Sequence, residues 1–88
     1  MRIRDLEWDD ENIEHIAEHH VDPDEVEDIC YGRGLIERGR ENRHTILGQT
    51  REGRYLFIMV AHKGGGVFRP ITARDMTDAE RRRFQRQK

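Results

Sequence analysis

The sequence has 88 residues, 34% of them hydrophobic and 39% charged, and its mean hydropathy is -1.00. Such a length supports one modest hydrophobic core, so we expect a single domain over residues 1–88. No segment approaches the roughly 18 apolar residues of a membrane-spanning helix, and the N-terminus turns acidic instead of entering the apolar run of a secretory signal. The single cysteine, Cys30, excludes an internal disulfide framework and suits a reducing compartment. We therefore predict a cytoplasmic protein that does not associate with a membrane.

The net charge of -2 conceals an uneven distribution of charge along the chain. Residues 1–30 carry 2 basic and 12 acidic side chains, whereas residues 31–88 carry 14 basic and 6 acidic ones. An asymmetry of this size predicts an acidic face and a basic face, the second able to attract an anionic partner such as RNA or DNA. The alternative is that the two halves neutralise each other in the fold.

The N-terminal segment predicts a short extended stretch followed by a helix. Residues 1–8 alternate loosely between apolar and charged side chains, which is typical of a short strand or an extended lead-in. Asp9 or Asp10 can then cap a helix, and apolar residues recur at helical spacing up to about His19.

A second helix has a clear start in the sequence. Asp22 supplies a cap, Pro23 occupies the first helical position, and Glu25 is the carboxylate three residues after the cap. Gly32 and Gly34 end this helix.

The remainder of the chain predicts strands and a final helix. The segments rich in β-forming residues are 35–36, 43–50, 55–61 and 67–74. The third of them is the most apolar run in the chain and the best candidate for a central strand. Pro70 cannot donate a ladder hydrogen bond, so we expect a bulge or an unpaired edge there. Thr77 and Glu80 form a capping box that opens a short polar helix, in which Phe84 is the apolar residue.

These elements together predict an α+β domain. We expect the two N-terminal helices to pack on one face of a small antiparallel sheet of three or four strands, with a short C-terminal helix. The N-terminal stretch is either an additional strand or a lead-in.

Arginine dominates the residues suited to binding a polyanion. Guanidinium groups bind phosphate bidentately and remain charged at any cellular pH, so several converging arginines can hold a phosphodiester and stabilise charge in its transition state. The alternative is a solvated basic surface, which we favour for the run from Arg81 to Arg83. The candidates are Arg43, Arg51, Arg54, Arg69, Arg74 and Arg81.

The histidines allow two further hypotheses. His15 and His19 are four residues apart on one predicted helix, a spacing that can clamp a metal ion. A zincin signature would place a glutamate directly after the first histidine, and here Ile16 follows it, so we favour a structural or surface role and predict neither metal nor cofactor. His44 and His62 are closer to the basic region and could carry a proton near neutral pH; the alternative is that both lie on the surface at strand ends.

Nucleophilic catalysis and nucleotide binding fit the sequence poorly. Cys30 lies on an apolar stripe and is expected to be packed, and the chain contains no serine. The three consecutive glycines from Gly64 to Gly66 lack the lysine and following helix of a phosphate-binding loop.

Several short motifs occur in an order and spacing that are specific in combination. They are Trp8-Asp9 with Asn12, His19, Val21 and Glu25; Leu47-Gly48 with Gly53-Arg54 and Leu56; and Arg69 with the block Ile71-Thr72-Ala73-Arg74-Asp75-Met76-Thr77 and Glu80-Arg81. This pattern resembles the BrnT family of type II toxins, small proteins similar to the RelE-like ribonucleases. The resemblance covers nearly the entire chain, and its final block is the most specific part.

The resemblance implies a compact RelE-like α+β fold and a metal-independent endoribonuclease, in which the ribose 2′-hydroxyl attacks the adjacent phosphate and leaves a cyclic phosphate. It also implies a partner, a DNA-binding antitoxin, and leaves a homodimer open. Arg54 and Arg74 match functional arginines of the family, while Phe84 stands where the family usually has tyrosine. The predicted catalytic residues are Arg54, Arg74, His44 and Phe84, and the predicted RNA-binding residues are Arg43, Arg51, Arg69 and Arg81.

A second hypothesis of a different class follows from Phe84. Because phenylalanine lacks the hydroxyl of tyrosine, the chain could be a non-catalytic, degenerate toxin, or a module that binds nucleic acid or protein without cutting RNA. A metal-dependent enzyme built around His15 and His19 is the third alternative.

Overall fold

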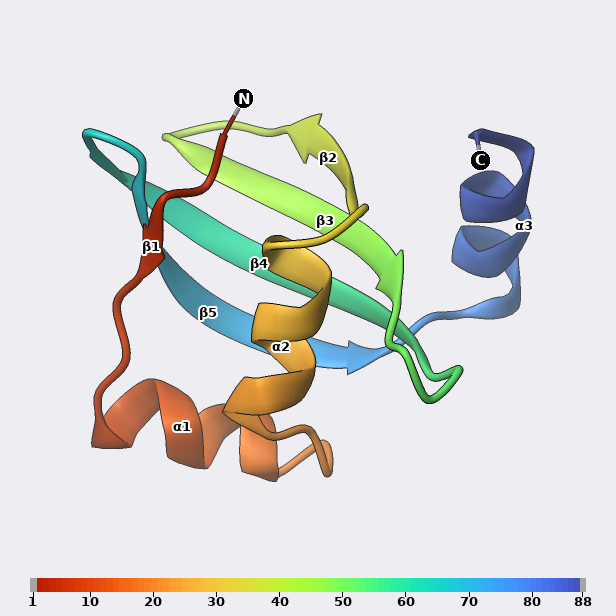
Figure 1. Cartoon of the computed structure of the whole chain (residues 1–88), viewed down its shortest axis with the longest axis horizontal. Coiled ribbons are helices and arrows are strands. Elements are labelled where there is room, and N and C mark those ends of the chain that lie inside the picture. The colour runs from red at the N-terminus through yellow and green to blue at the C-terminus, as the bar shows by residue number, and fades with distance from the viewer. Residues whose placement is uncertain (1, 88) are drawn as a thin grey trace.

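A computed structural model describes residues 2–87, which form an α+β fold of helices and one mixed sheet (Figure 1). The elements are β1 (Asp5–Leu6), α1 (Asp10–Ala17), α2 (Pro23–Cys30), β2 (Leu35–Arg38), β3 (Arg43–Gln49), β4 (Tyr55–Gly64), β5 (Val67–Asp75) and α3 (Asp78–Gln87). The sheet has 5 strands in the order β1-β5-β4-β3-β2. The predicted α+β class and the central position of residues 55–61 in the sheet are confirmed.

The helices begin where their capping residues predict. The Asp22 carboxylate accepts a hydrogen bond from the Glu25 amide at 3.0 Å, and the Glu25 carboxylate accepts one from the Asp22 amide at 3.1 Å. Thr77 and Glu80 make the same reciprocal pair at the start of α3. Each box satisfies amides that the first helical turn leaves without partners. The first helix ends at Ala17, slightly before the predicted end.

The sheet differs from the prediction in its first strand. We expected an antiparallel sheet, and β2 to β5 are antiparallel, but β1 pairs with β5 in parallel. Two helices separate β1 from β2, so the chain crosses the sheet before it starts the antiparallel hairpins. The crossover places β2 at the far edge of the sheet, and the hairpins that follow bring β5 back beside β1, parallel to it.

A β-bulge in β5 determines which residues share a face with Arg74. Val60 pairs with Pro70 and Met59 pairs with Thr72, so Ile71 has no partner in the ladder. The bulge predicted from Pro70 is confirmed. It shifts the alternation by one residue, and Arg74 therefore lies opposite Phe57 in the register.

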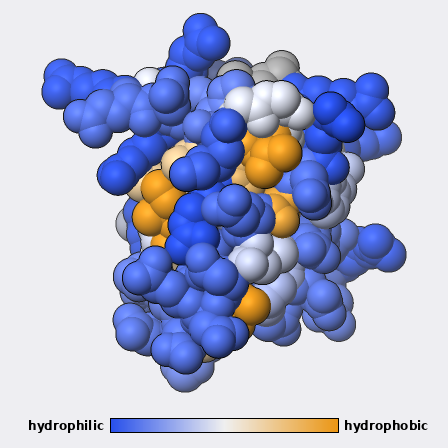
Figure 2. All heavy atoms as spheres, turned by 90° about the vertical axis from the view of Figure 1, so that its left-hand side faces the viewer, coloured by the Kyte–Doolittle hydropathy of each residue, from blue (hydrophilic) through white to orange (hydrophobic). Residues whose placement is uncertain are grey.

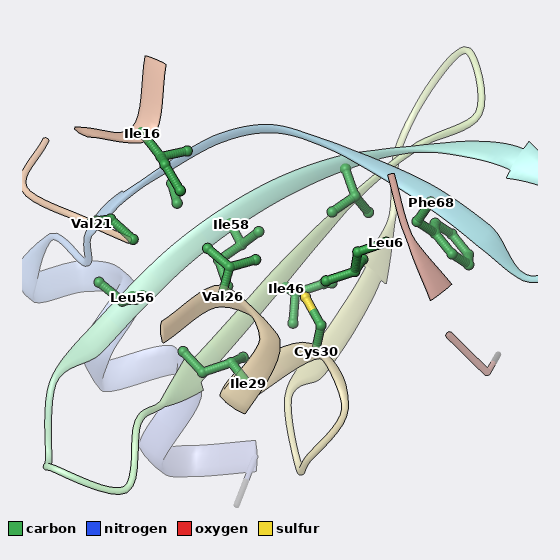
Figure 3. Packing of buried hydrophobic residues seen from close by; sticks show 12 residues of the cluster. Leu6, Ile16, Val21, Val26, Ile29, Cys30, Ile46, Leu56, Ile58 and Phe68 are labelled. Atoms are coloured by element: carbon green, nitrogen blue, oxygen red, sulfur yellow. The ribbon is translucent and has the colours of Figure 1, made fainter. Parts of the chain in front are cut away.

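The hydrophobic core lies between the sheet and the first two helices (Figures 1 and 3). Its members include Ile16, Val26 and Ile29 from the helices and Ile46, Leu56, Ile58 and Val60 from the sheet. Gly48 on β3 lies directly beneath Ile29, whose side chain occupies the space a Cβ atom would need, so the helix approaches the strand closely. Cys30 belongs to this core, and burial raises the pKa of its thiol to about 12. An un-ionised thiol is a poor nucleophile, in agreement with the packed role expected for Cys30.

The surface is strongly hydrophilic. Figure 2 shows the side of the molecule that carries β1, where charged and polar side chains surround small apolar areas. Within residues 2–87, no helix is long and apolar enough to cross a membrane.

Candidate active site on the outer face of the sheet

The central strand β4 presents two different faces. Leu56 and Ile58 are fully buried against the helices, and because side chains alternate along a strand, Tyr55, Phe57 and Met59 point to the opposite side. The strand pairing adds neighbours on this second side, which we call the outer face. The outer face includes Thr45, Leu47, Gln49, Tyr55, Phe57, Met59, Thr72 and Arg74.

Two arginines lie over aromatic rings of the outer face. The Arg74 guanidinium carbon is 4.0 Å from the centre of the Phe57 ring, and the Arg81 guanidinium carbon is 4.0 Å from the centre of the Tyr55 ring. Both distances are within the range of cation–π attraction. Tyr55 and Phe57 are two residues apart on one strand, so the two stacked pairs are neighbours, separated by roughly 7 Å along it.

Glu80 fixes the orientation of Arg74. The two terminal guanidinium nitrogens of Arg74 donate to the two carboxylate oxygens of Glu80 at 2.8 and 3.0 Å, and one of them also donates to the Asp75 carbonyl at 3.0 Å. This bidentate pair lowers the pKa of Glu80, chiefly through the Arg74 hydrogen bonds, and raises the pKa of Arg74. Glu80 also caps α3, so the start of that helix and the position of Arg74 depend on the same carboxylate.

The lowered pKa of Glu80 predicts a loss of stability in acid. A carboxyl group whose pKa is lower in the folded state stabilises the fold at pH values above its ordinary pKa, which is 4.5 for Glu80. That contribution is lost as the pH falls through the pKa of the folded state. Glu80→Gln keeps a capping side chain but no charge. We expect it to lower the free energy of unfolding by about 1 kcal/mol at pH 7, and this difference should shrink below about pH 4.5. Urea unfolding of both proteins at pH 7 and pH 3.5 measures it; a difference that is unchanged in acid would contradict the assignment.

Helix α3 is anchored to the outer face by several side chains. Arg83 donates to the Glu37 carboxylate of β2 at 3.0 Å, and the rings of Phe84 and Tyr55 meet edge to face with centroids 6.1 Å apart. The Gln85 amide nitrogen lies 3.5 Å from the Tyr55 hydroxyl. The outer face is therefore bordered by α3 at the end where Tyr55 lies.

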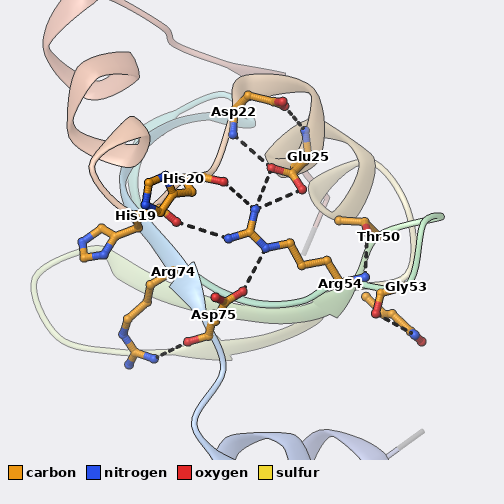
Figure 4. Close-up of polar contacts among 10 residues, drawn as sticks. His19, His20, Asp22, Glu25, Thr50, Gly53, Arg54, Arg74 and Asp75 are labelled. Atoms are coloured by element: carbon orange, nitrogen blue, oxygen red, sulfur yellow. Dashed lines mark hydrogen bonds and ion pairs between the residues drawn. The ribbon is translucent and has the colours of Figure 1, made fainter.

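Arg54 lies on the other side of the sheet, in a network of its own (Figure 4). Its guanidinium donates to the carboxylates of Asp75 at 2.9 Å and Glu25 at 3.1 Å, and to the carbonyls of His20 at 2.6 Å and His19 at 3.2 Å. Only 27% of its side chain is exposed. The hydrogen bond to Asp75, and after it the hydrogen bond to Glu25, raises the pKa of Arg54. Arg54 therefore ties the loop between α1 and α2 to the ends of β4 and β5.

The sequence hypothesis required Arg54 and Arg74 to converge on one site, but the structure places them on opposite sides of the sheet. Asp75 pairs with Leu56 and Arg74 with Phe57, and successive residues of a strand point to opposite faces. Arg54 reaches the Asp75 carboxylate on the helix side, whereas Arg74 stacks on Phe57 on the outer side. Figure 4 shows Arg74 directed away from the network around Arg54.

The two other residues predicted to be catalytic are both buried. His44 is 3% exposed, and its ring lies 5.7 Å from that of Phe68, which belongs to the core. His62 stacks on the same phenylalanine, with centroids 4.6 Å apart. Phe84 is 5% exposed and packs against Tyr55. His44 is therefore on the helix side of the sheet, and Phe84 contacts the outer face only through an apolar ring.

The predicted RNA-binding arginines are distributed over the molecule. Arg81 is on the outer face, and Arg43 is exposed at the start of β3. Arg51 is 90% exposed along its side chain and pairs with Asp28, while Arg69 pairs with Asp9 at the start of α1. Because Arg51, Arg54 and Arg69 all bind carboxylates of the first 30 residues, these contacts support the alternative in which the two halves of the chain neutralise each other.

The paired histidines of α1 do not form a larger cluster. The His15 and His19 rings are 6.1 Å apart, edge to face, and both residues are exposed. Among residues 2–87, no group of three or more His, Cys, Asp or Glu side chains is arranged to hold a metal ion.

Sequence reasoning missed the aromatic residues of the site. Tyr55 and Phe57 were assigned to a central strand and given no functional role. The signal that could have identified them is the alternation with Leu56 and Ile58, since large rings on the solvent side of a strand add nothing to the helix-facing core.

Comparison with known proteins identifies the family of this chain. The fold and its outer face define a small α+β protein that presents guanidinium groups beside aromatic rings. The family model described as the ribonuclease toxin BrnT of type II toxin–antitoxin systems matches residues 8–80, and the chain belongs to this family. The family implies RNA as substrate and an antitoxin as partner.

A solved structure shares the fold. The crystal structure of the Brucella abortus ribonuclease toxin BrnT superimposes with a TM-score of 0.68 at 16% sequence identity, covering 84% of this chain and 97% of that chain. No match is found among curated proteins.

Proposed function

We propose that the protein is a cytoplasmic, metal-independent endoribonuclease that binds single-stranded RNA on the outer face of its sheet. The observation that carries the proposal is the pair of neighbouring stacks, Arg74 over Phe57 and Arg81 over Tyr55. The family, and the ribonuclease named in the similar crystal structure, support RNA as the substrate. Whether the fold is RelE-like stays a prediction.

The outer face has the two kinds of group that single-stranded RNA requires. Unpaired bases stack on aromatic rings or on guanidinium planes, and phosphates bind to the guanidinium edges. Tyr55 and Phe57 are half-buried, so the sheet supports their side chains and part of each stays accessible. Glu80 holds Arg74 in a fixed orientation, which reduces the entropy lost when a phosphate binds.

The proposed reaction is a transesterification within the RNA. The 2′-oxygen attacks the adjacent phosphorus, a bond forms between them, and the bond from phosphorus to the 5′-oxygen breaks, leaving a 2′,3′-cyclic phosphate and a 5′-hydroxyl. Negative charge increases on the phosphate oxygens in the transition state. Arg74 is the group that we assign to stabilise it, because its guanidinium is always charged and is already oriented.

The role predicted for Arg54 from the sequence changes in this proposal. All three of its guanidinium nitrogens donate to Asp75, Glu25 and two backbone carbonyls on the helix side of the sheet, so it acts as a structural residue. Phosphate binding is assigned to the two stacked arginines of the outer face, Arg74 and Arg81. The antitoxin partner is proposed to be the DNA-binding protein encoded beside this chain. The proposed RNA site is formed by residues of one copy of the chain.

The rival function is binding of RNA without cleavage, and Phe84 favours it because it carries no hydroxyl for proton transfer. Fluorescently labelled single-stranded RNA incubated with the purified chain in excess EDTA separates the two. We expect cleavage to fragments ending in a cyclic phosphate. Salt-sensitive binding without cleavage would support the rival function, and the absence of both would contradict any role in RNA binding.

A further inference from the structure

We propose that the hydroxyl of Tyr55 donates the proton that the leaving 5′-oxygen of the RNA takes up. This inference rests on the proposed ribonuclease function and adds to it the group that protonates the leaving oxygen. The arginines of the outer face cannot supply it, since a guanidinium does not give up a proton at any cellular pH.

Tyr55 is held in place on the outer face from several sides. It is the first residue of β4, and its carbonyl accepts a hydrogen bond from the Met76 amide at 3.1 Å. Arg81 covers its ring at 4.0 Å, Phe84 packs edge to face against it, and Gln85 lies 3.5 Å from its hydroxyl. A group fixed in this way can transfer a proton without first being ordered.

The proton donor and the phosphate-binding group lie on the same face of β4, as the step requires, because the leaving 5′-oxygen is bonded to the phosphate that Arg74 binds. Tyr55 and Phe57 point to the same side of β4 and are two residues apart, roughly 7 Å along the strand. Arg74 lies over Phe57, so a phosphate bound at the guanidinium of Arg74 is adjacent to the Tyr55 ring. The phosphate and the proton donor are thereby brought together by the strand itself.

The other candidate proton donors are excluded by their position, by their charge or by having no proton to donate. His44 is buried in the core against Phe68, on the side of the sheet that faces the helices. Phe84 has no proton to donate. Glu80 has a pKa below its ordinary value because of Arg74, so it is ionised at neutral pH and has no proton to give.

Among the described residues of the outer face, the remaining hydroxyl groups are those of threonines. Thr45 donates its hydroxyl proton toward Glu37 at 3.5 Å. A phenol gives up its proton far more readily than an aliphatic hydroxyl does, and it is still protonated at neutral pH. Tyr55 therefore combines a transferable proton with a position beside Arg74.

In the proposed step, one bond to phosphorus forms and another breaks. The bond from the 2′-oxygen to phosphorus forms while the 2′-hydroxyl proton passes to solvent water. The bond from phosphorus to the 5′-oxygen breaks while the Tyr55 hydroxyl gives its proton to that oxygen, which becomes the 5′-hydroxyl. Tyr55 is left as a phenolate, which the Arg81 charge 4.0 Å above its ring stabilises, and it regains a proton from water.

Tyr55→Phe is the direct test, because it removes the hydroxyl and keeps the ring that Arg81 and Phe84 contact. We expect the single-turnover cleavage rate to fall by roughly 10² to 10³, the range for loss of a general acid, with RNA affinity and melting temperature unchanged. Tyr31→Phe is the matched control. Tyr31 is the other of the chain's 2 tyrosines, lies 50% exposed after α2, and should lose its hydroxyl without effect.

A modified substrate distinguishes proton donation from a structural role. RNA in which sulfur replaces the 5′-oxygen at the cleavage site has a thiolate leaving group, which needs no proton. Tyr55→Phe should cleave this substrate at nearly the rate of the unmutated protein. Failure of the sulfur substrate to restore the rate, or cleavage of normal RNA by Tyr55→Phe at full rate, would overturn the inference and leave the ribonuclease proposal standing. An unmutated protein that cleaves no RNA would overturn both.

Discussion

Arg74→Ala is expected to slow RNA cleavage about a hundredfold while leaving the fold intact. Removing one preorganised donor to the charge of a transition state costs roughly 3 kcal/mol, which corresponds to that factor. Arg74 lies at the end of β5, outside the core, and its stability contribution through Glu80 is that of a partly exposed ion pair, about 1 kcal/mol. Single-turnover cleavage of labelled single-stranded RNA, with urea unfolding of the same preparations, measures both quantities.

Two further variants make the Arg74 result specific. Arg40→Ala removes the same charge from the exposed turn between β2 and β3, at the opposite end of the sheet, and should leave the rate nearly unchanged. Arg74→Lys keeps the charge but not the planar fork, so we expect an intermediate rate. Full activity of Arg74→Ala would exclude Arg74 from the reaction and move the RNA site away from the outer face.

Features that depend on neighbouring residues were predicted well from the sequence. The capping residues Asp22 and Glu25 are three positions apart, and so are Thr77 and Glu80, so their hydrogen bonds form whenever the helix forms. Pro70 lacks an amide hydrogen wherever it is placed, and the bulge beside it follows. These are local consequences of residue type.

The predictions that failed depend on contacts between distant parts of the chain. The pairing of β1 with β5 joins residues about 60 positions apart, and no local pattern indicates its direction. The positions of the arginines failed for the same reason. Alternation on β5 shows that Arg74 and Asp75 face opposite sides, but only the packed fold shows that Asp75 is a partner of Arg54.

The candidate site was predicted in its residue types but not in its arrangement. Arg74 and Arg81 were identified as arginines that could bind phosphate, and both lie over rings of the outer face. His44 was selected because histidine is a residue type suited to proton transfer, but burial against Phe68 keeps it away from a surface reaction. Tyr55 was overlooked because its hydroxyl becomes a functional candidate only when α3 is seen beside it.

Arg54→Ala is expected to destabilise the fold by roughly 3 kcal/mol, which for a chain of this size lowers the melting temperature by roughly 10 to 20 °C. The substitution leaves Glu25 and Asp75 without their shared cation and leaves two backbone carbonyls of the loop between α1 and α2 without a donor. Arg51→Ala, in the same hairpin, removes a fully solvated arginine that pairs with Asp28 and should cost less than about 1 kcal/mol.

The same variant tests whether Arg54 has any part in the reaction. Below its melting temperature, Arg54→Ala should cleave RNA at nearly the rate of the unmutated protein per folded molecule, because the network around Arg54 lies on the side of the sheet opposite to Arg74. Calorimetry and single-turnover cleavage on one preparation give the two values. A variant of unchanged melting temperature that no longer cleaves RNA would assign phosphate binding to Arg54 after all, and would require the RNA to cross from the outer face to the loop between the helices.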